Sequence, residues 1–405
     1  MAWIEKRGTK YRVVWDTGTP DDRTRRVETF DVWDDADKYR KKIDYQDSLG
    51  ITFDPSKMTV GEYLDYWLKL HGDKLAPKTF KSYQCEISNH IIPLLGKVKL
   101  SKLKPLQLQN YYAGLLASGR ADLLQREADK LPEGNKREAL EKRIRDMKQL
   151  GLSTTTVRYH HRIIHKALQQ AVKWQMVSRN VADAVELPKP VPPKIDYLRK
   201  EDIHTFIKII KDSPDYPAIA VAIFTGMRQG EILGLRWKDI DLDRGVIHVR
   251  QQLQYLGKDG FDFHDPKRGS RRDIPMPLPL NGIFRYVARE QDRLKSIYAE
   301  SETNEYKDLG LIFCNHDGSE MEGSGLTKRF QALLVKAGLP KIRFHALRHT
   351  FATMCRAAGM ELADIQDLLG HADISTTKKM YAHIELETLR KSMDKFTEYM
   401  DIGEA

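Results

Sequence analysis

The first fifty residues alternate between short apolar runs and turn-forming segments. The apolar runs are Trp3-Ile4, Tyr11 to Trp15 and Val27 to Val32. The turn-forming segments Arg7-Gly8-Thr9 and 17–22 separate them, and a helical pattern follows from about residue 34 to residue 48. The pattern predicts a three-stranded antiparallel sheet with one helix. We place this module at residues 1–55, and it is too small to be an enzyme.

From residue 57 onward the apolar positions follow a helical period. Thr59 and Glu62 have the spacing of a capping box, and an apolar stripe through Trp67 follows them. Further helices are expected at 78–91 (ending near Pro93), 105–118 and 153–176. We therefore expect a helical domain over residues 57–187.

A charged insertion interrupts the helical domain at residues 121–150. It contains 8 basic and 7 acidic residues with only scattered apolar positions. This composition favours a solvated helical hairpin.

A proline-rich linker at residues 188–195 divides the chain. The segment 187–193, Leu-Pro-Lys-Pro-Val-Pro-Pro, cannot continue a helix and favours an extended backbone. Beyond the linker, helices are expected at 200–211 and 217–234, strands at 246–254 and 261–276, and helices from there to the end. The fold class is therefore multidomain α+β, with residues 196–405 forming a mainly helical domain around a small antiparallel sheet.

The positive charge is concentrated in one part of the chain. The formal net charge is +10, but residues 1–50 are neutral overall, residues 51–195 carry +11, and residues 196–405 carry −1. Such a concentration suggests a domain that faces a polyanion, since lysine and arginine that neutralise phosphates release counterions. A well-solvated surface explains the same composition, so charge alone leaves both interpretations open.

The remaining composition excludes several classes of protein. Three widely spaced cysteines, Cys85, Cys314 and Cys355, fit neither a disulfide framework nor a zinc cluster, and they suggest a reducing compartment. There is no apolar run of about 18 residues and no secretory signal at the N-terminus, so we expect no membrane association. No metal-ligand spacing and no glycine-rich phosphate loop occur, so neither a metal nor another cofactor is expected.

Three segments of the last domain concentrate polar residues that can bind a phosphate. They are Thr-Gly-Met-Arg-Gln-Gly-Glu at 225–231, His-Ala-Leu-Arg-His-Thr at 345–350, and Leu-Gly-His at 369–371 followed by Tyr381. Each alone has an ordinary explanation: Arg228 as a surface partner of Glu231, His345 as a core histidine, Tyr381 as a structural tyrosine. Their joint occurrence in this order favours one phosphate site.

These motifs resemble those of the tyrosine recombinases, the phage integrase family, and the resemblance is close to the integrases of Gram-positive phages and conjugative transposons. The resemblance implies that Arg228 and Arg348 clamp the scissile phosphate through bidentate hydrogen bonds. It also implies that His345 and His371 assist hydrogen bonding and proton movement. Tyr381 is then the nucleophile that forms a 3′-phosphotyrosine and releases a 5′-hydroxyl.

The family also uses a lysine on a β-hairpin as general acid for the leaving oxygen. Lys267 is the matching residue, and Lys258 in the turn 257–260 is a weaker candidate. Relatives commonly carry threonine after this lysine, where this chain has Arg268. Glu231 is expected to orient Arg228 rather than to react.

The implied activity is site-specific DNA recombination by a bacterial, cytoplasmic integrase of a mobile element. The implied partners are double-stranded DNA at core and arm attachment sites, a tetramer of this chain on DNA, an excisionase and a host DNA-bending protein. Residues 1–55 would bind arm sites, residues 57–187 the core site, and residues 196–405 would be catalytic. A type IB topoisomerase-like enzyme and a non-catalytic DNA-binding regulator remain as alternatives.

The end of the chain carries a further apolar stripe. Leu386, Leu389, Met393, Phe396 and Met400 recur at helical spacing. This helix either packs on its own domain or docks on a neighbouring protomer.

Overall fold

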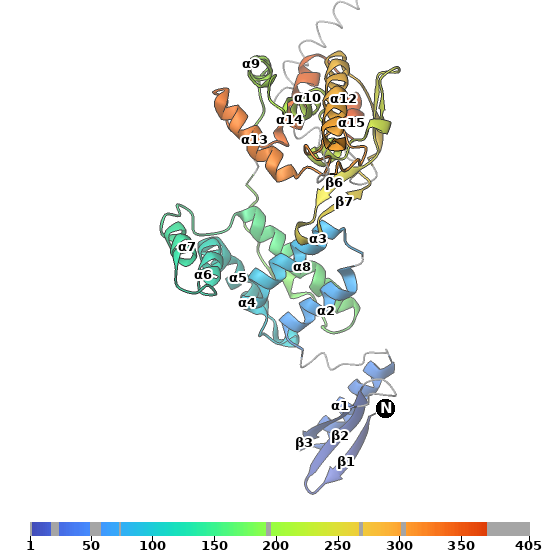
Figure 1. Ribbon diagram of the computed structural model, residues 1–405. Coiled ribbons are helices and arrows are strands. Elements are labelled where there is room, and N and C mark those ends of the chain that lie inside the picture. The colour runs from blue at the N-terminus through green and yellow to red at the C-terminus, as the bar shows by residue number, and fades with distance from the viewer. Residues whose placement is uncertain are drawn as a thin grey trace, which may run out of the picture. The chain divides into compact units, whose positions relative to one another are not determined.

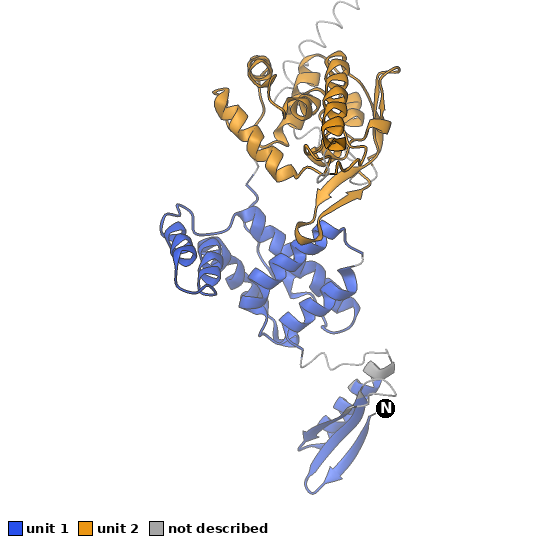
Figure 2. Ribbon diagram, viewed as in Figure 1, with its two compact units in different colours: residues 1–192 blue, residues 193–405 orange. Residues whose placement is uncertain are grey.

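The computed structural model describes residues 2–17, 24–48, 58–72, 74–191, 196–266, 270–300 and 305–370 (Figure 1). It divides into two compact units, residues 1–192 and 193–405 (Figure 2). The division falls inside the proline-rich segment 188–195. The first unit contains two separate apolar clusters, one in the N-terminal module and one in the helical part.

The N-terminal module is an antiparallel sheet covered by one helix. Its elements are β1 (Trp3–Arg7), β2 (Lys10–Thr17), β3 (Thr24–Phe30) and α1 (Trp33–Ser48). The strand order is β1-β2-β3, and Val13 and Trp15 of the central strand are buried in one cluster with Ala36 and Ile43 of α1. The predicted sheet and helix are therefore confirmed.

The helical part of the first unit follows residue 57. Its described residues form nine helical elements between residues 60 and 173 and one more short element before the linker. They are α2 (Val60–Gly72), α3 (Pro77–Glu86), η1 (Ile87–Ile91), α4 (Ile92–Leu95), η2 (Leu100–Lys102), α5 (Pro105–Ala117), α6 (Gly119–Ala128), α7 (Asn135–Arg145), α8 (Thr154–Lys173) and, last, η3 (Val181–Ala184). The predicted capping box is present: the Glu62 amide donates to Thr59 Oγ1 (3.3 Å), and the Thr59 amide donates to Glu62 Oε2 (2.8 Å). Tyr63 and Trp67 of α2 are fully buried in the core.

The predicted helix end at Pro93 lies two residues too early. The helical path runs through the π-helical turn η1 into α4 and ends at Leu95. Pro93 is the second residue of α4 and follows the π-helical turn η1 closely, and the helical path continues past it.

The charged insertion forms the helical hairpin expected from its sequence, made of α6 and α7. In α7 no residue is buried, whereas α6 buries Leu124 and Ala128. Backbone bonds close its base, since the Arg120 amide donates to Leu150 O (2.9 Å) and the Leu152 amide to Leu115 O (2.8 Å). The hairpin therefore leaves the helical core intact.

The second unit surrounds α10 with helices and adds two small sheets. Its elements are α9 (Lys200–Ile210), α10 (Tyr216–Thr225), α11 (Gln229–Leu233), η4 (Trp237–Asp239), β4 (Ile240–Asp241), β5 (Val246–Val249), β6 (Gln252–Tyr255), η5 (Gly257–Asp259), β7 (Phe261–His264), β8 (Arg272–Pro275), α12 (Leu278–Ala299), α13 (Gly323–Lys336), α14 (Ala346–Ala357) and α15 (Leu362–Leu369). Strands β4, β5 and β8 form one antiparallel sheet, and β6 pairs with β7 in a hairpin. Nearly every residue of α10 is buried, and α10 packs against α12 and α14 (Figure 1).

Three expectations for this unit need correction. The single helix predicted at 217–234 is two helices, because Gly226 adopts a left-handed conformation (φ 62°) and Arg228 starts a new helix. Each of the two predicted strands is likewise divided into two strands. Strand β5 pairs with β8 while β6 pairs with β7, so the chain passes from one sheet to the other between β5 and β6.

No helix among the described residues is long and apolar enough to cross a membrane.

Candidate active site

Two glycines in left-handed conformations end the helices that frame the site. Gly226 (φ 62°) follows α10 and Gly370 (φ 63°) follows α15. Glycine is favoured at such helix ends because it has no Cβ to clash at positive φ. The last carbonyls of both helices thereby become acceptors for side chains from other segments.

Arg348, on α14, bridges these two helix ends from inside the fold. Its residue exposure is only 3%. Its Nη1 donates to Gly226 O (2.8 Å) and its Nη2 donates to Leu369 O. The guanidinium therefore holds two of the motif-bearing segments together.

Arg228 contacts the end of α15 from a more exposed position than Arg348. It is the N-cap of α11, with 22% of its side chain exposed. Its Nη1 donates to Glu231 Oε1 (2.7 Å) and its Nη2 to Gly370 O (3.3 Å). The carboxylate of Glu231 also accepts from the Arg228 amide (3.0 Å), so it orients both the backbone and the side chain of Arg228.

Glu231 is fully buried between two arginines. Arg272 of β8 donates through Nη2 to Oε2 (2.8 Å) and through Nη1 to Oε1 (3.2 Å), and Oε1 also accepts from Arg228. Burial alone would raise the pKa of Glu231, but the hydrogen bonds and charge of Arg272 and the charge of Arg228 bring this pKa below its ordinary value. Glu231 is therefore an anion that neutralises part of the positive charge of the site.

His345 lies at the N-cap of α14, with its ring centroid 5.4 Å from that of His349. Desolvation of the ring lowers the pKa of His345 to about 4, assisted by His349 and by the positive charges of Arg348 and Arg228. At neutral pH its imidazole is uncharged, so it can donate or accept a hydrogen bond without adding to the positive charge.

Three of the six residues predicted to act on a phosphate thus surround the ends of α10 and α15. They are Arg228, His345 and Arg348. Lys267, His371 and Tyr381 lie outside the described residues, as does the apolar stripe at 386–400.

Arg272 is a site residue that the sequence analysis missed. It stands in the segment that contains Lys267, and it shares a strand face with Ile274, which is 2% exposed. An arginine at an inward-facing strand position needs a buried anionic partner. The alternation of inward-facing and outward-facing residues along this strand was the signal in the sequence that could have identified Arg272 as a buried residue.

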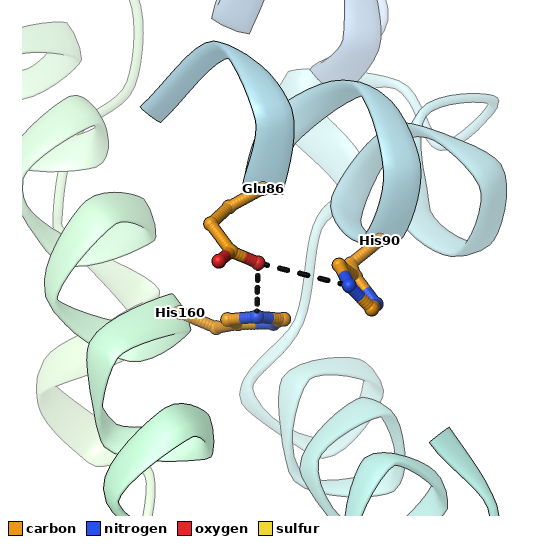
Figure 3. Close-up of side chains that lie close together, drawn as sticks. All are labelled: Glu86, His90 and His160. Carbon is orange, nitrogen blue, oxygen red and sulfur yellow. Dashed lines mark hydrogen bonds and ion pairs between the residues drawn. The ribbon is translucent and has the colours of Figure 1, made fainter. Parts of the chain in front are cut away.

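The described residues hold one group with metal-ligand chemistry, Glu86, His90 and His160 of the helical part (Figure 3). His160 Nε2 lies 2.8 Å and His90 Nε2 3.7 Å from Glu86 Oε2. The Tyr111 hydroxyl lies 2.9 Å from His160 Nδ1, and burial raises the pKa of this phenol, which keeps its proton.

The contacts of Tyr111, His160 and Glu86 form a hydrogen-bond relay, which does not include the buried Nδ1 of His90. Because the Tyr111 phenol keeps its proton, it donates to His160 Nδ1, and His160 Nε2–H then donates to Glu86. Neither ring nitrogen of His160 therefore offers a lone pair to a metal. The positive charge of Arg126 also acts on His90 and opposes a further cation. We therefore interpret the group as a buried polar link between α3, α5 and α8.

Substituting Gly226 by alanine is expected to destabilise the second unit by about 2 kcal/mol, because a Cβ is strained at positive φ and would overlap the Phe351 ring. Thermal unfolding of the full chain measures this change. Gly245→Ala is the matched control, since Gly245 also has a positive φ (64°) but its Cβ would meet no atom within 4 Å. Equal losses in both variants would contradict the steric part of the explanation.

Comparisons with known proteins identify the family and the fold of this chain. The model described as Phage integrase family matches residues 196–387, and the Phage integrase, N-terminal SAM-like domain matches residues 59–116. The tyrosine recombinase XerC-like protein of Caldanaerobacter subterraneus is 26% identical over 364 residues, which cover 85% of this chain and 84% of that protein.

Solved structures share the fold. The Tn1549 transposon integrase in complex with transposon right end DNA superposes with a TM-score of 0.64 at 21% identity, covering 84% of this chain and 99% of that one. A lambda integrase tetramer bound to a Holliday junction superposes with a TM-score of 0.54 at 16% identity, covering 91% and 95% of the two chains. The predicted fold class is thereby confirmed. This chain belongs to the phage integrase family of tyrosine recombinases.

Proposed function

We propose that this protein is the integrase of a mobile element, a site-specific recombinase that cuts and rejoins DNA through a 3′-phosphotyrosyl intermediate. The observation that carries the proposal is the convergence of Arg228 and Arg348 on the ends of α10 and α15, with the neutral His345 nearby. Two guanidinium groups at one point suit the double negative charge that develops on a phosphate under attack.

In the proposed reaction the phenol oxygen of Tyr381 attacks the scissile phosphorus. The bond from phosphorus to the 5′-oxygen breaks, the 3′-phosphotyrosine forms, and Lys267 supplies the proton that makes the leaving group a 5′-hydroxyl. Arg228 and Arg348 stabilise the pentacoordinate transition state, while His345 and His371 hydrogen-bond near the phosphate and the nucleophile. A 5′-hydroxyl of the partner strand then attacks the phosphotyrosine and restores both the phosphodiester and the free tyrosine.

This cycle conserves the free energy of the broken bond. Each cleavage exchanges one phosphate ester for another, so joining needs no nucleotide. The proposed roles therefore depend on side chains of this protein alone.

We assign the DNA contacts to separate parts of the chain. The excess of +11 over residues 51–195 supports placing the core site on the helical domain of residues 57–187. Residues 1–55 would bind arm sites, and residues 196–405 would carry the chemistry. A tetramer on DNA, an excisionase and a host DNA-bending protein complete the proposed assembly in the bacterial cytoplasm.

The test is trapping of the covalent intermediate on a suicide duplex. The duplex carries the attachment site, taken from the DNA that flanks the gene, with a nick that lets the released strand diffuse away. We expect a protein–DNA adduct on denaturing gels with the wild type and none with Tyr381→Phe.

Other outcomes would support other functions. Binding without any adduct in the wild type would favour a DNA-binding regulator. Relaxation of supercoiled plasmids that lack the attachment site would favour a topoisomerase. An adduct that persists in Tyr381→Phe would place the nucleophile elsewhere.

A further inference from the structure

One buried arginine, Arg272, connects three segments around the candidate active site. Its side chain is only 7% exposed, compared with 22% for Arg228. It lies on β8 and donates through Nη1 and Nη2 to Glu231 near the start of α11, and through Nε to Leu368 O at the end of α15 (2.7 Å). These are the segments that carry the Arg228 motif, the strand after Lys267, and the Leu-Gly-His motif.

The end of α15 is bound by three arginines in succession. The carbonyls of Leu368, Leu369 and Gly370 accept from Arg272, Arg348 and Arg228, respectively. Carbonyls at a helix C-terminus lack partners within the helix and carry the negative end of its dipole, so cations are favoured there. Their sequential pairing defines where the chain leaves α15 toward His371.

Arg272 differs from the more exposed Arg228 in how many of its guanidinium nitrogens bind protein groups. Nε, Nη1 and Nη2 all donate to protein groups, with Nη1 also 3.3 Å from Ser270 O. Every guanidinium nitrogen of Arg272 is engaged by a protein group, and Arg272 lies outside the motifs that carry Arg228 and Arg348, so we take it to act through its neighbours rather than on a phosphate. Resting on the function proposed above, we propose that Arg272 is a positioning residue, which holds Glu231 and the end of α15 so that Arg228 is ready to bind the scissile phosphate.

Close packing at Gly370 fixes this geometry. A Cβ at Gly370 would lie 3.0 Å from Ser270 Cβ and 3.2 Å from Arg272 Cδ. The backbone after α15 therefore rests directly on the Arg272 side chain. Lysine cannot replace this contact and the two-point fork together, because its ammonium is a single point charge.

The pKa of Glu231 depends on the charged groups that face its carboxylate. Arg272 faces it from β8 and Arg228 from the start of α11, while His345 of α14 interacts with it more weakly. Arg272 is the strongest influence that lowers the pKa of Glu231. Without Arg272, Glu231 takes up a proton at higher pH and no longer orients Arg228.

The experiment compares Arg272→Met, Arg272→Lys and wild type as full-length proteins on the nicked attachment-site duplex. We expect Arg272→Met to form the covalent adduct about 30-fold more slowly at pH 8, with DNA affinity within about threefold of wild type. The acidic limb of its rate–pH profile should move upward by about one pH unit. Arg272→Lys keeps a charge beside Glu231, so it should restore the acidic limb but only part of the rate.

Arg329→Met is the matched control. Arg329 of α13 also forms a fork on a buried carboxylate, with Nε 2.8 Å from Asp215 Oδ2 and Nη2 2.9 Å from Asp215 Oδ1, but it touches none of the three motifs. We expect its adduct rate per folded molecule to stay within about twofold of wild type.

The outcomes separate the two proposals. Absence of an adduct with the wild type refutes the proposed function and not the role of Arg272. A wild-type rate in Arg272→Met overturns the positioning role. The positioning role is also overturned if Arg329→Met slows the reaction equally, or if the acidic limb of the rate–pH profile does not move in Arg272→Met. Should Arg272→Met fail to fold, the split between rate and pH profile in Arg272→Lys decides alone.

Discussion

Replacing Arg228 by lysine is expected to slow adduct formation about 10³-fold while the protein remains folded. Lysine retains the positive charge, but a single ammonium cannot hold Glu231 and Gly370 O and also offer a fork to a phosphate. Loss of a donor that acts on the transition state lowers the rate far more than the affinity for DNA. The measurement is the single-turnover rate on the suicide duplex, together with the dissociation constant for an intact duplex.

Arg236→Lys provides the control for this prediction. Arg236 lies in the same segment, also pairs with a carboxylate three residues later, Asp239 (2.7 Å), and has 24% of its side chain exposed compared with 22% for Arg228. We expect this variant to react at nearly the wild-type rate. If both variants slowed equally, the effect would lie in folding of the segment and not in phosphate binding.

Local patterns were sufficient to predict much of the fold. Strand alternation located the N-terminal sheet, and the Thr59–Glu62 capping box marked the start of α2 because both partners are close in sequence. The three-residue spacing of Arg228 and Glu231 likewise predicted their pairing. In each case one turn or one hairpin contains the whole interaction.

The features of the fold and of the site that the sequence did not predict depend on contacts between distant segments. Gly226 within an apolar stretch fits a continuous helix by pattern, and the break follows from packing against Phe351 and Leu369. The pairing of β5 with β8 rather than with β6 is likewise set by the fold and not by either strand alone. The contact of Arg272 with Glu231 spans 41 residues, so no local spacing indicates it.

Replacing Glu231 by glutamine is expected to reduce the stability of the second unit by about 3 kcal/mol at pH 7, because two arginines then lose their shared buried counter-charge. The pH dependence follows from the lowered pKa of Glu231. A carboxyl group whose pKa is lower when folded stabilises the protein fully above its ordinary value of 4.5, and this contribution is lost as the pH falls through the folded value. The stability gap between wild type and Glu231→Gln should therefore narrow below about pH 4.5.

Urea unfolding of the full chain at pH 7, 5 and 4 measures this gap, with hydrogen exchange on peptides from α10 and α11 to report on the second unit by itself. Asp239→Asn is the matched control, since among the described residues Asp239 pairs with one arginine, Arg236. We expect its stability loss to be less than half that of Glu231→Gln. A gap for Glu231→Gln that stays constant from pH 7 to pH 4 would show that the buried charge of Glu231 does not stabilise the fold, and the arginines would then be held in place by the carbonyls of Gly226 and of residues 368–370.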